Sequence, residues 1–128
     1  MIQENENKKF VLKYFKAISH VAKTEKLCDE FMTDQNLKEH IIFFDSIFPG
    51  YELIAEEMMS EGNRIMIRAR LKGTHKGNFN GIHPTNKKVD FPFVINYTIE
   101  NEKITQHWMI ADQMILMEQL GVANVEAQ

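Results

Sequence analysis

The sequence of 128 residues has little cysteine and no repetitive segment, and both shortages exclude classes of protein. Its one cysteine, Cys28, cannot form an intrachain disulfide or supply a zinc-binding spacing. No internal repeat, linker or low-complexity stretch interrupts the chain, which has the length of one domain. A chain without disulfides suits a reducing interior, so we expect a single cytoplasmic domain that spans residues 1–128.

The sequence also lacks long apolar runs and any excess of basic residues. No segment approaches the about 20 apolar residues of a membrane span, and the start "MIQENENKKF" has no apolar core of a signal peptide. The formal charge is -3 and the pI is near 5.9, with basic residues interspersed among acids. We therefore expect neither a membrane nor a nucleic acid as partner.

Apolar residues at spacings of three and four predict helices in the first part of the chain. The first covers residues 4–24 and the second, shorter helix covers 25–32. Asp34 is a favourable N-cap and predicts a third helix, whose apolar stripe runs through 37–48. The segment "FPGY" ends that helix, because proline pushes the preceding residue out of the helical region.

Alternating residues in the second part predict an antiparallel meander. Strands are expected over 51–59, 64–75 and 88–100, and a fourth follows the turn at 101–102. A short helix over 113–120 then closes the chain. Helices followed by hairpin-connected strands indicate an α+β fold. We expect a core of about residues 8–122, with frayed segments at both ends.

The turn at 101–102 has a consequence for the last strand. If these two residues are the hairpin loop, directly opposed residues of the two strands share a face of the sheet. Asp112 then continues the apolar face of Trp108 and Ile110. The predicted register pairs Tyr97 with Gln106, Ile95 with Trp108, and Phe93 with Ile110.

Three pieces of sequence in fixed order carry a resemblance. They are "FFDSIFPGYEL", "IRARLKGTHKGNFNGIHPT" and "KITQHWMIADQMILMEQLG". Together they resemble the SnoaL-like polyketide cyclase and ester cyclase family over about residues 37–122. The matching positions are Gly73, Thr74, His75, Gly77, Phe79, Gly81, Pro84 and Thr85, and then Lys103, Ile104, Trp108, Asp112, Leu116, Gln119, Leu120 and Gly121.

The resemblance implies a cone in which a curved antiparallel sheet wraps around helices and encloses a ligand cavity. It also implies that Asp112 is the general acid and base of an intramolecular aldol ring closure, without a metal or organic cofactor. The chain departs from the family pattern at three positions. Gln106 replaces a glutamate, Asn86 replaces a glycine, and His83 stands where proline is common.

Asp112 has two interpretations, as a helix N-cap or as a pocket carboxylate. A cap would accept helix amides and have a lowered pKa, whereas burial beside Trp108 would raise the pKa toward a useful range. His40, on the third helix, is either a packing residue or a second catalytic group. His107 alternates away from Asp112, so we do not expect these two to act as a pair. Candidate substrate-binding residues are Phe44, His75, Phe93, Tyr97, Gln106 and Trp108.

Two hypotheses for function follow. The first is a cofactor-free cyclase or isomerase that acts on an apolar carbonyl compound, with no metal site. The alternative is a non-catalytic binding module for a hydrophobic ligand, in which Asp112 only caps its helix. Because members of the family are commonly dimers, we also expect a homodimer formed through an exposed sheet face. That face is predicted to carry Val94, Asn96, Thr98, Thr105, His107 and Met109.

Overall fold

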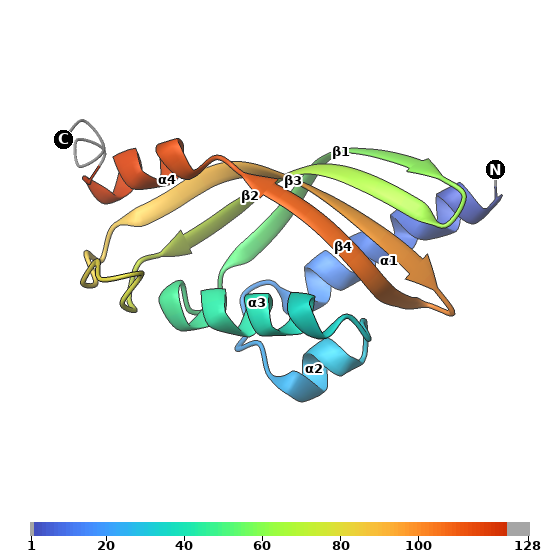
Figure 1. The fold of residues 1–128 in the computed structure, drawn as a ribbon, viewed down its shortest axis with the longest axis horizontal. Helices are drawn as coiled ribbons and strands as arrows, with labels where there is room; N and C mark the ends of the chain where they lie inside the picture. Colours follow the sequence, from blue (N-terminus) through green and yellow to red (C-terminus); the bar gives the residue numbers. More distant parts are fainter. Residues whose placement is uncertain (1, 123–128) are drawn as a thin grey trace.

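A computed structural model describes residues 2–122, in which four helices accompany one four-stranded sheet (Figure 1). The strands are antiparallel in the order β1-β2-β3-β4, so each pairs with its neighbour in sequence. The expected α+β meander is therefore confirmed. The elements are α1 (Ile2–Ile18), α2 (Glu25–Asp29), α3 (Gln35–Ile47), β1 (Glu52–Glu61), β2 (Arg64–Thr74), β3 (Lys88–Glu100), β4 (Lys103–Ala111) and α4 (Gln113–Leu120).

The sheet curves over α1 and α3, which lie on its concave side, while α2 lies beyond α3 (Figure 1). The core fills the space between these helices and the sheet. Residues alternate between buried and solvent-facing along β2 and β3, as the sequence pattern predicts. The buried residues of these two strands are Ile65, Ile67, Ala69, Leu71, Val89, Phe91, Phe93, Ile95, Tyr97 and Ile99.

The helices in the first part of the chain end earlier than predicted. The first ends at Ile18 rather than near residue 24, because His20 adopts a left-handed backbone with φ 64°. Thr24 instead caps α2 by accepting from the Leu27 amide. Asp34 caps α3, as predicted, by accepting from the Leu37 amide. None of these helices is both long and apolar enough to cross a membrane within residues 2–122.

The start of the chain is ordered against the turn between β1 and β2, so the expected N-terminal fraying is wrong. Asn7 is buried, and its Nδ2 donates to Ser60 Oγ and to the Gly62 carbonyl. Glu4 accepts from the Gly62 amide. These bonds hold the first turns of α1 on the sheet. The expected frayed segment at the other end falls mostly on residues 123–128, outside the described residues.

The last hairpin departs from its predicted register. Glu100 pairs with Lys103 as expected, but the next pairs are Ile99 with Ile104 and Thr98 with Gln106. Thr105 is therefore an extra residue on β4, and every later side chain points to the opposite face. The observed pairs across β3 and β4 are Tyr97 with His107, Ile95 with Met109, and Phe93 with Ala111.

Candidate functional site

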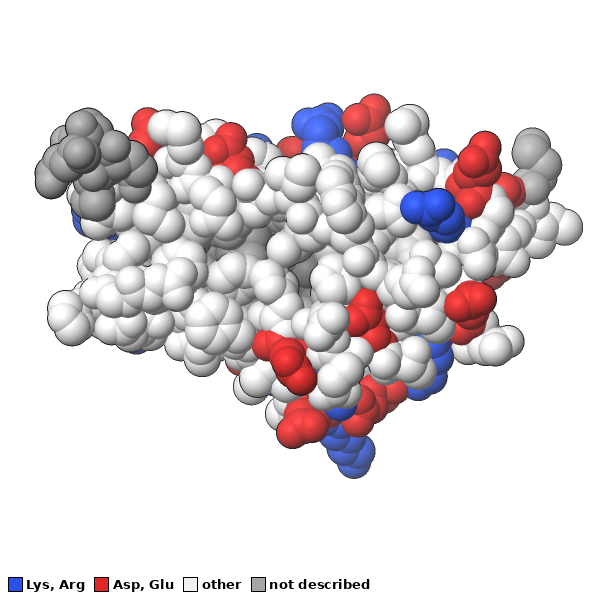
Figure 2. Space-filling model, in the orientation of Figure 1, with Lys and Arg blue, Asp and Glu red and all other residues white. Residues whose placement is uncertain are grey.

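An apolar cavity lies between the concave face of the sheet and helices α1 and α3. Its volume is about 430 Å³, including space that is open to solvent. Figure 2 shows a hollow on this face of the molecule, between β4 and α3. The residues that line it are Tyr14, Leu37, His40, Ile41, Phe44, Tyr51, Leu53, Leu71, Phe91, Phe93, Ile95, Tyr97, Met109 and Ala111.

A hydrogen-bonded pair, Asp34 and His107, joins α3 to β4 beside this cavity. His107 Nδ1 lies 2.7 Å from Asp34 Oδ2, and a carboxylate can only accept, so Nδ1–H donates. The side chains are 18% and 10% exposed for His107 and Asp34, so solvent screens the pair only in part. The other oxygen, Asp34 Oδ1, accepts from the Leu37 amide at 3.0 Å. The Asp34 carboxylate therefore caps a helix with one oxygen and accepts a hydrogen bond from an imidazole with the other.

Backbone bonds explain why the two residues meet. The carbonyl of Ile104 accepts from the amides of Thr33 (2.9 Å) and Asp34 (3.2 Å), and the Ile104 amide donates to Phe31 (2.8 Å). These bonds fix the segment before α3 against the start of β4. The extra residue at Thr105 then turns His107 toward the concave side. The position of this pair thus depends on a strand irregularity and not on regular alternation.

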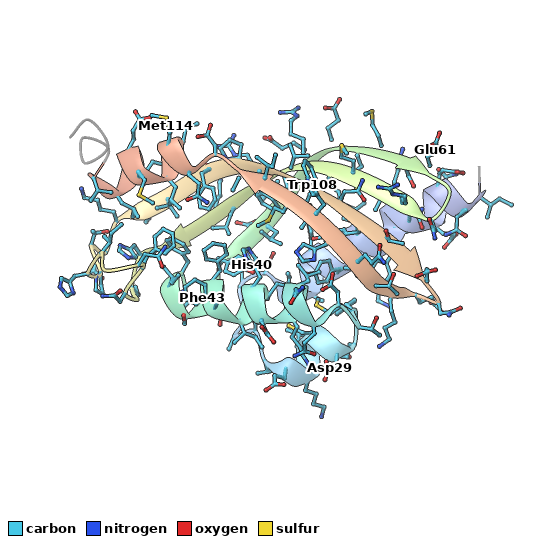
Figure 3. The ribbon with its side chains drawn as sticks, in the orientation of Figure 1. Asp29, His40, Phe43, Glu61, Trp108 and Met114 are labelled. Carbon is cyan, nitrogen blue, oxygen red and sulfur yellow. The ribbon has the colours of Figure 1, made fainter. Side chains whose placement is uncertain are left out.

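His40 provides a second imidazole at the cavity wall. It is half-buried and packs edge-on against Phe44, with ring centroids 4.4 Å apart. Figure 3 shows it on the side of α3 that faces the sheet. Burial lowers its pKa from the ordinary value of 6.5, and nearby His107 lowers the pKa further. His40 is therefore uncharged at neutral pH and can either donate or accept a hydrogen bond.

Three tyrosines, Tyr14, Tyr51 and Tyr97, form the buried part of the wall. The rings of Tyr14 and Tyr97 meet edge to face, with centroids 5.9 Å apart. Burial raises the pKa of all three phenols above the ordinary value of 10. They remain protonated at any physiological pH.

Asp112 lies outside this arrangement, and its predicted position in the pocket is wrong. It is exposed and caps α4, and its Oδ1 accepts from the Ile115 amide at 3.0 Å. Trp108 and Ile110 share its side of the sheet and are 53% and 59% exposed. The cause is the extra residue at Thr105, which reverses the two faces of β4.

The other predicted binding residues divide into two groups. Phe44, Phe93 and Tyr97 line the cavity, so substrate contact remains a prediction for them. Gln106 and Trp108 project from the opposite face of β4, and His75 lies outside the cavity lining. Across residues 2–122, no three His, Cys, Asp or Glu side chains come close enough together to hold a metal ion.

The sequence matches one protein-family model over most of its length. The family model for SnoaL-like polyketide cyclases matches residues 24–120. The chain belongs to this family. No curated protein matches it significantly.

Solved structures of SnoaL-like and related proteins share the fold at low sequence identity. AclR, a proposed hydroxylase from Streptomyces galilaeus, has a TM-score of 0.79 at 21% identity, covering 92% of this chain and 97% of AclR. A SnoaL-like polyketide cyclase from Agrobacterium tumefaciens has a TM-score of 0.72 at 22% identity, covering 90% and 98% of the two chains. A phenazine biosynthesis-related protein from Pseudomonas aeruginosa has a TM-score of 0.70 at 14% identity, covering 94% and 83%.

The residues that carry the SnoaL-like motifs maintain the fold around the cavity. A Cβ on Gly77 would lie 2.0 Å from the Ser46 carbonyl oxygen, so only glycine lets this loop pack against the end of α3. His75 is fully buried, and its Nδ1 accepts from the Thr85 amide at 3.2 Å, which closes the same loop. Gln119 exchanges two hydrogen bonds with the backbone of Asp90 and fixes α4 to β3.

Sequence reasoning found four residues of the cavity wall, His40, Phe44, Phe93 and Tyr97, but missed the Asp34–His107 pair beside it. The sequence pattern predicts only a capping role for Asp34 and a solvent-facing position for His107. No local signal links them, because 73 residues separate the pair in sequence. The SnoaL-like motif positions therefore identify the family, while His40, Asp34 and His107 lie at positions that the motif match does not include.

Proposed function

We propose that the protein is a cofactor-free enzyme of the cyclase or isomerase type that acts on an apolar carbonyl compound. Membership of the SnoaL-like family supports this class of activity. The observation that carries the proposal is the Asp34–His107 pair beside an apolar cavity whose wall also holds an uncharged His40. Paired carboxylate and imidazole groups are a common arrangement for general base catalysis.

The proposed chemistry begins with proton removal from the carbon next to the carbonyl. Asp34 accepts the Nδ1–H of His107, which leaves Nε2 of the neutral imidazole as the proton acceptor. Asp34 also stabilises the imidazolium that forms. The enolate carbon then attacks a second carbonyl group of the same molecule, or is reprotonated at another carbon. His107 returns its proton to the resulting oxygen or carbon, so no proton is gained or lost overall.

His40 has a supporting role in this scheme. Its low pKa keeps it neutral, so it can donate a hydrogen bond to a substrate oxygen without bringing a second positive charge close to protonated His107. The apolar walls would exclude water from the enolate. The substrate requirement is therefore a mainly hydrophobic molecule with an acidic C–H beside a carbonyl group.

A second candidate function is binding without catalysis. The observation that favours it is Asp112, which caps α4 on the outer face although the family resemblance assigns it the proton transfer. In this alternative, the cavity holds a hydrophobic ligand and the Asp34–His107 pair only fastens α3 to β4. The two candidates differ in whether the bound ligand exchanges protons.

The test uses exchange of α-hydrogens for deuterium in small cyclic ketones, followed by NMR in D₂O. This measures the proposed first step without knowledge of the natural substrate. We expect exchange by the wild type to exceed that of buffer, and His107→Gln to lower the rate by about 100-fold or more. Asp112→Asn is the matched control and should exchange at the wild-type rate. Ketone binding without accelerated exchange would leave the binding module as the function.

A further inference from the structure

One buried polar group in the cavity has no hydrogen-bond partner among the described residues. The hydroxyl of Tyr14 projects from α1 and is shielded from solvent, yet it makes no well-formed hydrogen bond. Buried hydroxyls are normally satisfied, because leaving one unpaired forfeits its hydrogen bonds to water without replacing them. Tyr14 lines the same cavity as His40. A ligand in this cavity could therefore satisfy the Tyr14 hydroxyl by supplying an acceptor.

Tyr97 brings a second hydroxyl close to the first. The two rings meet at 78° with centroids 5.9 Å apart, and Tyr97 comes from the middle of β3. The two hydroxyls lie close enough for a weak hydrogen-bond interaction, which raises the pKa of Tyr14 and lowers the pKa of Tyr97, although burial has the larger effect on both. The cavity wall is mostly apolar, and its aliphatic and phenylalanine side chains offer no acceptor.

The register of the last hairpin places this pair beside the proposed base. Tyr97 lies directly opposite His107 across β3 and β4, and opposed residues have Cβ atoms about 4.5–5.5 Å apart on the same face. In a ketone, the oxygen is two bonds from the carbon that carries the acidic hydrogen. A ligand whose oxygen reaches the tyrosines therefore brings that C–H toward the imidazole.

We propose that the Tyr14 and Tyr97 hydroxyls together donate to a single oxygen atom of the ligand, either a carbonyl that becomes an enolate or a phenol. The catalytic part of this inference rests on the proposed function, whereas the binding part does not. Neutral donors in a water-excluded site stabilise developing negative charge without having to reorganise. The expected ligands are compact and largely hydrophobic, with one oxygen at the end that enters first.

The experiment compares two probes of similar size, 4-nitrophenol and nitrobenzene, which differ by one hydroxyl group. Calorimetry or equilibrium dialysis measures their affinity for the wild type. We expect 4-nitrophenol to bind more tightly, and Tyr14→Phe and Tyr97→Phe each to lower its affinity about tenfold. The affinity for nitrobenzene should not fall in either variant, because the apolar walls are retained.

Tyr51→Phe is the matched control, since it removes a phenolic hydroxyl from the same cavity without removing either proposed donor. It should leave the preference for 4-nitrophenol unchanged. Melting temperatures establish that all three variants fold. Equal binding of the two probes by the wild type, or an equal loss in Tyr51→Phe, would overturn the donor pair. Failure of ketone exchange with a retained preference for 4-nitrophenol would instead overturn the proposed catalysis alone.

Discussion

At the scale of single residues, Asp34 and not Asp112 is the aspartate that pairs with an imidazole. Asp112 and Asp34 both precede a helix and both cap it through an oxygen that accepts an amide. Only Asp34 directs its second oxygen to an imidazole. Asp112 caps its helix on the outer face of the sheet, whereas Asp34 caps a helix whose residues Leu37 and His40 line the cavity, and it also orients an imidazole. The two aspartates are the same residue type, and they differ in burial and in the partner of the second carboxylate oxygen.

Asp112 should behave as a structural residue in mutants. Asparagine is about as good an N-cap as aspartate, so Asp112→Asn should change the free energy of unfolding by less than about 0.5 kcal/mol. Asp112→Ala removes the acceptor for Ile115 and should cost about 1 kcal/mol. Urea denaturation measures both. A large loss of ketone exchange in Asp112→Asn at unchanged stability would restore this residue to the catalytic site.

Asp34 should affect activity and stability separately. Asp34→Asn keeps a cap for the Leu37 amide but removes the negative charge that would stabilise protonated His107. We therefore expect little change in unfolding free energy and a loss of ketone exchange of about tenfold or more. Parallel urea denaturation and NMR exchange measure the two effects. Equal exchange by wild type and variant would show that the carboxylate has only its capping role.

His40 should make the fold sensitive to acid. Its folded pKa lies below 6.5, so the unfolded chain binds the proton more readily. Stability should therefore fall as the pH drops below about 6.5, and the loss should level off once the pH is below the folded pKa. In His40→Gln this contribution is absent, so unfolding free energy should depend less on pH between 7 and 5. His20→Asn, which removes an exposed imidazole, is the control. An unchanged pH dependence in His40→Gln would contradict the assignment.

At the scale of elements, the hairpin between β3 and β4 contains a strained turn. Asn101 and Glu102 both have positive φ, 52° and 60°, as the two central residues of a type I′ turn require. Asparagine tolerates this region well, but glutamate does not. We expect Glu102→Gly to raise the free energy of unfolding by about 0.5–1 kcal/mol in urea denaturation. Glu100→Gly, in the adjoining strand, should lower it, and stabilisation by both would exclude the turn as the cause.

The same hairpin shows which parts of the molecule the sequence could predict. Burial along β3 alternates without interruption from Val89 to Ile99, and the pattern alone locates its inner face. On β4, apolar residues lie on both faces, with Met109 inside and Trp108 outside. Hydrophobicity therefore could not indicate that one residue is inserted at Thr105. The motif match located the fold and the cavity, but a single irregularity determined which β4 residues enter it.

At the scale of the whole molecule, the convex face of the sheet carries an unusual row of exposed apolar side chains. Met59, Met66 and Trp108 stand in one line across the four strands, with Asn96 between the last two. Their exposed fractions are 67%, 38% and 53%. Large exposed apolar patches on a soluble domain mark interaction sites. The predicted dimer face needs one correction, because β4 contributes Trp108 and Ile110 to it rather than His107 and Met109.

We propose that a second copy of this chain covers that face. Trp108→Glu should shift the protein from dimer to monomer, because it places a charge in the middle of the apolar row. Light scattering after gel filtration measures the mass. Trp108 is the only tryptophan, so its fluorescence should also shift to longer wavelength when the wild type is diluted. Met114→Glu, on the exposed side of α4 (Figure 3), should remain dimeric. A monomeric wild type at micromolar concentration would overturn the proposal.

The bond between Asp34 and His107 also has a consequence for the order in which the protein is made. The two residues are 73 positions apart, and His107 belongs to the last strand of the sheet. During synthesis, α3 and its cap can form well before β4 leaves the ribosome, but the imidazole arrives only with β4. Chains that stop before β4 therefore contain the α1, α2 and α3 segments but lack the proposed base. The proposed proton chemistry therefore becomes possible only after β4 has joined the sheet, so activity would depend on a strand that is made long after the helix that orients the base.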